Sequence, residues 1–71
     1  MELKVNAMYR IAHNATKPEL RGKPCVLKYL AKTESDLRLF GLDYARRALV
    51  YLVTSDGSLG QAYRVTPESL R

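Results

Sequence analysis

The sequence predicts a small all-β domain, and three observations support this fold class. The chain has 71 residues, a length that suits one domain (residues 1–71) and leaves no room for two. Apolar residues make up 46% of the chain and charged residues 27%, which is the composition of a folded globular domain rather than of a disordered one. Short β-prone runs separated by turn signals account for most of its length.

Alternation and composition predict the first two strands. From Leu3 to Ile11 the odd positions are apolar or aromatic and the even positions are mostly polar, which is typical of a half-buried strand. The polar stretch that follows contains Pro18 and predicts a loop. A second β-prone run covers residues 25–31, but its two faces are too mixed for its inward side to be assigned.

A β-hairpin is the clearest predicted element. Residues 48–53 form a continuous β-branched and aromatic run that is too short for a helix. The turn after it contains an Asp-Gly pair, in which Gly57 takes positive φ without strain, and a second strand follows over residues 61–65. Beyond the hairpin, Thr66 and Pro67 are expected to be the cap and the first residue of a single helical turn.

Residues 33–45 allow three interpretations: a loop carrying a helical turn, an extra short strand pair, or a true helix. Thr33 followed by Asp36 is a helix start signal, and apolar residues recur after it at helical spacing. Gly41 falls in the middle of that pattern. We predict a loop or short helical insertion between the second and third strands.

The order of these elements follows a known pattern. A first strand, a loop ending in Leu20-Arg21-Gly22-Lys23, a second strand, an Asp-Gly hairpin and a final turn resemble the SH3-like small β-barrels. The loop is similar to that of the KOW type found in ribosomal and transcription-elongation proteins. This resemblance covers residues 3–32 and 46–71, and it implies a barrel of about five strands with an insertion at 33–45. Such barrels bind RNA or proteins, or serve as small subunits of larger complexes.

The sequence lacks the side-chain patterns of catalysis and of metal binding. Cys25 is the single cysteine and His13 the single histidine, so neither a disulfide nor the roughly four ligands of a zinc site are available. His13 has no catalytic partner at a motif spacing, and Cys25 fits a small apolar strand residue better than a nucleophile. We therefore expect no enzymatic activity, no cofactor and no metal.

Membrane and secretory signals are also missing from the sequence. The longest continuous apolar run, residues 48–53, is far shorter than the roughly 18 residues of a membrane span. The first residues lack the basic start and apolar stretch of a signal peptide. We expect a cytoplasmic protein that makes no membrane contact and is a monomer or a weak homo-oligomer.

The positive charge is concentrated in the first half of the chain. Lys and Arg number 12 against seven Asp and Glu, for a net charge of +5, and +4 of it falls in residues 1–35. Clustered cations neutralise phosphates, and tyrosine rings stack on bases. We therefore predict RNA or DNA binding through a basic rim made of Lys17, Arg21, Lys23, Lys28, Tyr29, Lys32, Arg46 and Arg47. Further candidates for a stacking ring are Tyr9, Tyr51 and Tyr63.

The alternative function is that of a protein-interaction module, an accessory subunit or small regulator of a larger complex. The insertion is richer in large apolar residues than a solvated loop requires, so these residues either join the core or bind a partner. The residues assigned to this surface are Leu37, Leu39, Phe40, Leu42 and Tyr44.

Overall fold

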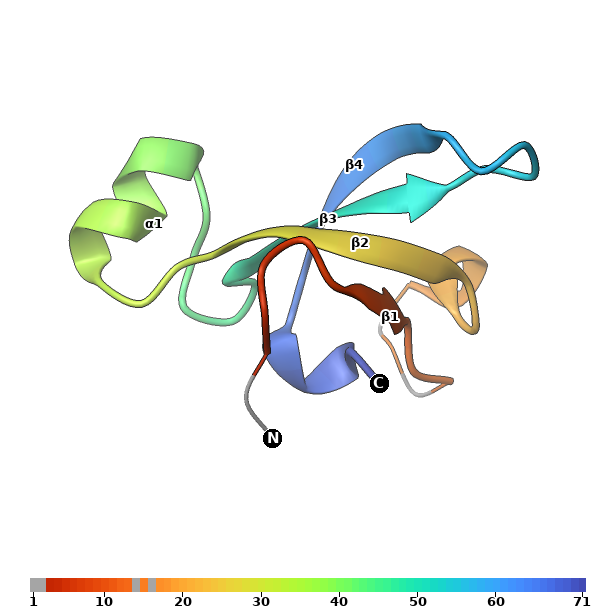
Figure 1. Ribbon diagram of the computed structural model, residues 1–71. Helices are drawn as coiled ribbons and strands as arrows, with labels where there is room; N and C mark the ends of the chain where they lie inside the picture. Colours follow the sequence, from red (N-terminus) through yellow and green to blue (C-terminus); the bar gives the residue numbers. More distant parts are fainter. Residues whose placement is uncertain (1–2, 14, 16) are drawn as a thin grey trace.

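The computed structural model describes residues 3–13, 15 and 17–71, and its strands form a four-stranded antiparallel sheet in the order β1-β2-β3-β4 (Figure 1). The strands are β1 (Met8–Arg10), β2 (Pro24–Leu30), β3 (Ala48–Val53) and β4 (Leu59–Val65). The helical elements are α1 (Glu34–Phe40) and two single 3₁₀ turns, η1 (Pro18–Leu20) and η2 (Pro67–Ser69). The predicted all-β class is confirmed.

The first strand is shorter than its alternation predicts. A turn at Val5 and Asn6 precedes it, and Asn6 adopts the left-handed conformation at φ 71°, which Asn tolerates better than most residues. This turn leaves Val5 49% exposed, although the alternation placed its side chain inward. The prediction of a strand over residues 3–11 is therefore wrong before Met8, because a local turn interrupts the pattern.

A β-bulge in β2 explains its mixed faces. The pairing of β2 with β3 shifts register between Leu27 and Tyr29, and such an extra residue moves the following side chains to the opposite face. Cys25 and Leu27 are fully buried in the main core before the shift, whereas Leu30 packs against that core after it. A single period of two therefore fails to describe this strand.

The predicted hairpin is confirmed. β3 covers the expected residues 48–53 and pairs with β4, so that Val50 lies opposite Tyr63. Gly57 has φ 87° in the turn between them, a conformation that glycine adopts without strain.

The insertion forms the short helix α1. The Thr33 hydroxyl accepts a hydrogen bond from the Asp36 N–H (3.2 Å), and the Asp36 carboxylate accepts one from the Thr33 N–H (3.3 Å), which together make a capping box. Gly41 ends the helix in the left-handed conformation at φ 64°, so the glycine that interrupts the apolar pattern is the C-terminal cap.

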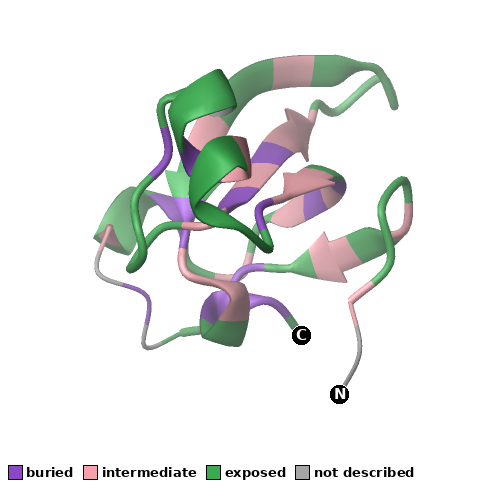
Figure 2. Ribbon diagram, turned by 90° about the vertical axis from the view of Figure 1, so that its left-hand side faces the viewer, coloured by how far each residue is buried: buried purple, intermediate pink, exposed green. Residues whose placement is uncertain are grey.

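Two apolar clusters hold these elements together. The smaller cluster, of Ala31, Leu37 and Leu42 with Tyr29 packed against it, joins α1 to the end of β2. The helix consequently projects from one end of the sheet (Figures 1 and 2). The larger cluster covers the face of the sheet to which Cys25, Leu27 and Val50 point, which we call the inner face; the opposite face is the outer face. Its members are Ile11, Ala15, Leu20, Cys25, Leu27, Ala48, Val50, Val65 and Leu70.

The last residues of the chain return to β1. The turn η2 begins at Pro67, as predicted, and Leu70 then forms an antiparallel bridge with Ile11. Arg10 and Arg71 exchange two backbone hydrogen bonds of 2.9 Å each. Within the described part of the chain, no helix has the length and apolar character needed to cross a membrane.

Candidate nucleic-acid interface

Among the described residues, the cationic side chains have almost no acidic partners. In the described ranges one ion pair forms, between Arg38 and Glu34 of α1 at 3.1 Å. The carboxylates of Asp36, Asp43 and Asp56 instead accept hydrogen bonds from backbone N–H groups and hydroxyls of their own loops. Because these acids bond within their own loops, few of the described cationic side chains are paired directly with a carboxylate.

Asp56 is the clearest case of a carboxylate that accepts hydrogen bonds from its own loop. Its carboxylate accepts hydrogen bonds from the Ser58 hydroxyl (2.6 Å), the Ser58 N–H (3.1 Å) and the Thr54 hydroxyl. These bonds, that of the Ser58 hydroxyl most of all, lower the pKa of Asp56 to about 2. The carboxylate is therefore ionised at neutral pH and holds the hairpin turn.

Two of the predicted cations, Lys17 and Arg46, line the same small cavity. Arg64 lines it as well, beside Thr66 and Ser69. We call this cavity, of about 20 Å³, the basic pocket. The predicted set of cations does not include Arg64. Arg64 lines this cavity because β4 lies beside the loops that carry Lys17 and Arg46.

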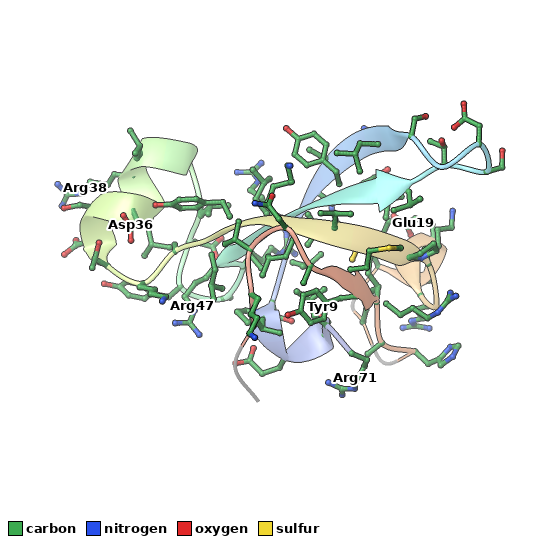
Figure 3. All side chains as sticks on the ribbon, viewed as in Figure 1. Tyr9, Glu19, Asp36, Arg38, Arg47 and Arg71 are labelled. Carbon is green, nitrogen blue, oxygen red and sulfur yellow. The ribbon has the colours of Figure 1, made fainter. Side chains whose placement is uncertain are left out.

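Lys32 and Arg47 line a different cavity, of about 300 Å³, which shares no lining residue with the basic pocket. Glu68 and Leu3 also line it, so an acid is present here. Arg47 and the turn η2 lie on the same side of the sheet (Figure 3).

The remaining predicted cations are exposed. The Arg21 Nε donates to the Ala15 carbonyl (2.8 Å), and the Lys28 Nζ donates to the Asn6 Oδ1 (3.2 Å). Lys23 is exposed just before β2. The predicted cations thus occupy several parts of the surface, and two of them, Lys17 and Arg46, line the basic pocket.

Tyr29 joins α1 to the sheet. Its ring packs against Ala31, Leu37 and Leu42. Burial raises the pKa of Tyr29, and a hydrogen bond to the Asp36 carboxylate raises it further. The hydrogen bond from the Lys32 N–H, followed by that from Tyr29 and those from Thr33, lowers the pKa of Asp36.

Tyr51 lies on the outer face of the sheet. The register aligns Met8, Val26, Tyr51 and Ala62 across the four strands. Since neighbouring side chains in a strand point to opposite faces, and Val50 is buried in the core, Tyr51 faces the other way. Tyr51 is half-buried, and Met8 in the same row is 64% exposed, so part of the Tyr51 side chain is open to solvent on the outer face. Tyr9 and Tyr63 instead pack against the larger cluster.

Cys25 is a packing residue. It is fully buried in the larger cluster, and burial raises the pKa of its thiol, which keeps the sulfur protonated and poorly nucleophilic. Across residues 3–13, 15 and 17–71, no three His, Cys, Asp or Glu side chains are grouped so that they could hold a metal ion.

The apolar residues of the insertion divide into two groups. Leu37 and Leu42 are buried in the smaller cluster, whereas Leu39 is 74% and Tyr44 73% exposed. The side chain of Phe40 lies outside the described part of the structure.

Comparison of the chain with protein-family models, with curated proteins and with solved structures finds no match. Function is therefore inferred from the residues and their geometry.

Proposed function

We propose that the sheet belongs to an SH3-like barrel of the KOW type, in which the residues after η2 act as a short fifth strand. The bridge between Leu70 and Ile11 and the paired backbone hydrogen bonds of Arg10 and Arg71 support this assignment. A helical turn between the fourth strand and this return segment is in keeping with the resemblance.

We further propose that the barrel binds RNA or DNA without catalysing a reaction. The observation that carries this proposal is the uncompensated charge: the chain has a net charge of +5, and its described residues form one ion pair. Free Lys and Arg side chains bind phosphates and release counterions, and Tyr51 adds a ring on which a base stacks. The cations assigned to this surface are Lys17, Arg21, Lys23, Lys28, Lys32, Arg46, Arg47 and Arg64.

Binding to a short single-stranded oligonucleotide, measured by fluorescence anisotropy, is expected to depend steeply on salt. Each phosphate contact contributes roughly 0.7 to the slope of log affinity against log salt for single strands. Four contacts therefore predict roughly a fiftyfold loss of affinity over a fourfold rise in salt. A protein that binds neither single-stranded nor duplex nucleic acid at low salt contradicts the proposal.

Replacement of Tyr51 by Ala is expected to weaken oligonucleotide binding, since stacking of one base on an aromatic ring contributes about 1–3 kcal/mol. That range corresponds to a loss of roughly 5- to 150-fold in affinity. Tyr51→Phe is the matched control, because it keeps the ring and removes only the hydroxyl. If Tyr51→Ala and Tyr51→Phe bind alike, the outer face is not the stacking surface.

The exposure of Leu39 and Tyr44 favours a second candidate function, docking of a protein partner on α1 and the loop after it. Two large apolar side chains, each about three-quarters exposed on one short insertion, offer apolar surface to a partner. The two functions differ in their response to salt, because screening weakens phosphate contacts far more than apolar ones. A stoichiometric protein partner that remains bound at high salt indicates docking at the insertion.

A further inference from the structure

The outer face of the sheet carries apolar side chains around one tyrosine. Val50 points into the core, so its neighbours on β3, Leu49 and Tyr51, point outward. The register places Val26 of β2 and Ala62 of β4 opposite Tyr51, one on each side. Side chains opposite each other in an antiparallel pair lie about 4.5–5.5 Å apart. Tyr51 is therefore flanked on both sides by an apolar side chain.

The same face carries cations and no carboxylate from the sheet. Every residue of β1–β4 is described, and none of them is Asp or Glu. Arg64 of β4 lies opposite Leu49, and Lys28 of β2 follows Leu27, which points into the core. An anionic ligand on this face therefore meets a cation on each side of β3 and no like charge from the strands.

Neutral oxygen atoms hold both of these cationic groups. The Lys28 Nζ donates to the Asn6 Oδ1 (3.2 Å), and the Arg64 Nη1 donates to the Gly41 carbonyl (2.6 Å). Such a contact positions the side chain without neutralising it and leaves other N–H groups for a ligand. Both residues are exposed, so their remaining donors are accessible to phosphate oxygens.

We propose that the outer face binds the unpaired bases of a single-stranded nucleic acid in preference to a duplex, an inference that rests on the proposed function. A base stacks on an aromatic ring only when one of its own faces is uncovered, as in a single strand. Val26, Leu49 and Ala62 extend the apolar surface around Tyr51. Their side chains have no donor or acceptor with which to read the base edges in a groove.

The short helix α1 does not supply a groove reader either. It carries two acids, Glu34 and Asp36, in its first turn, and Glu34 pairs with its cation Arg38 at 3.1 Å. These acids repel the phosphates on both sides of a duplex groove. The described structure therefore offers bases the outer face rather than a helix that enters a groove.

The charge of this face also argues against a second copy of the chain as its ligand. Two copies stacked through their outer faces would bring Lys28 and Arg64 of each together, with no carboxylate from any strand between them. Such like charges repel one another. An anionic ligand is therefore favoured over self-association.

Comparison of one labelled oligonucleotide with the same oligonucleotide annealed to its complement tests this preference by fluorescence anisotropy at low salt. Duplex DNA has the higher charge density, so a surface that contacts phosphates alone binds it at least as well as the single strand. We expect the single strand to bind about fivefold more tightly or better, from the stacking of one base. Tyr51→Ala should remove this preference by weakening single-strand binding alone, and Tyr51→Phe should retain it.

A second pair of variants places one new acid on either side of β4. Ala62→Glu puts a carboxylate beside Tyr51 at an exposed position and should lower single-strand affinity about fivefold or more by repulsion of the phosphates. Gln61→Glu is the matched control, with the same change of charge one residue away. The Gln61 Oε1 accepts a hydrogen bond from the Tyr63 hydroxyl (3.1 Å), and Tyr63 packs against the larger cluster on the inner face. This control should lose much less affinity.

Thermal melting shows whether each variant is folded, and the two Tyr51 variants decide the matter if Ala62→Glu is not. Equal affinity of wild type for single strand and duplex, or a preference for duplex, overturns the inference while the proposed function stands. Equal losses in Ala62→Glu and Gln61→Glu overturn it as well, as does a poly-glutamate peptide that displaces the strand as readily as unlabelled oligonucleotide of equal charge. If neither form of nucleic acid binds at low salt, the proposed function fails and this inference fails with it.

Discussion

Simultaneous replacement of Lys23 and Lys28 by Glu is expected to lower the affinity for a single-stranded oligonucleotide by about a hundredfold or more at low salt. Each lysine contact with a phosphate is worth about tenfold in affinity, and each new carboxylate repels the strand. Both lysines are exposed, and the one side-chain contact described for Lys28 is a hydrogen bond to the neutral Asn6. The fold should therefore tolerate the change.

The control for this double reversal must change the net charge by the same amount at positions outside the proposed surface. Lys4→Glu with Arg38→Glu does so, because both residues are exposed and neither belongs to the predicted set. Arg38 points away from the sheet at the far end of α1 (Figure 3). Equal losses of affinity in the two double variants, measured by fluorescence anisotropy, mean that net charge alone attracts the oligonucleotide and that Lys23 and Lys28 form no site.

The elements that the sequence predicted well are those fixed by near neighbours. The hairpin follows from a β-branched run and from a turn glycine, and Gly57 has the positive φ that this turn requires. The start of α1 follows from Thr33 and Asp36, which form the capping box three residues apart. In each case the residues that decide the structure lie within one turn of the chain.

The features that were missed depend on contacts between distant segments. The bulge at Lys28 arises where β2 pairs with β3. It turns the side chains that follow to the opposite face of the sheet, although no Gly or Pro marks it in the sequence. Arg64 lines the basic pocket because β4 lies beside loops that are distant in sequence. The hydrogen bonds of Asp43 and Asp56 within their own turns could not be predicted either, because they depend on the folded conformation of those loops.

Leu27→Ala is expected to cause the largest loss of stability among single core substitutions in β2. Leu27 is fully buried in the larger cluster, in the centre of β2 opposite Val50. Truncation of a buried leucine costs about 2–5 kcal/mol, because burial is lost and a cavity remains. A domain of this length has an unfolding free energy of roughly 4–10 kcal/mol at 0.05–0.15 kcal/mol per residue. Urea unfolding followed by circular dichroism should show a midpoint reduced by a large fraction.

Leu39→Ala makes the same chemical change on the surface of α1, where the side chain is 74% exposed. Its unfolding free energy is expected to stay within about 0.5 kcal/mol of wild type, since little burial is lost and Ala is the best helix former. Comparison of Leu27→Ala with Leu39→Ala therefore distinguishes a leucine that stabilises the core from one that lies on the surface. If Leu27→Ala is no less stable than Leu39→Ala, β2 does not form the centre of the core. A Leu39→Ala variant as stable as wild type is also the one suited to test docking at the insertion, because any partner it loses is lost from the binding surface and not through unfolding.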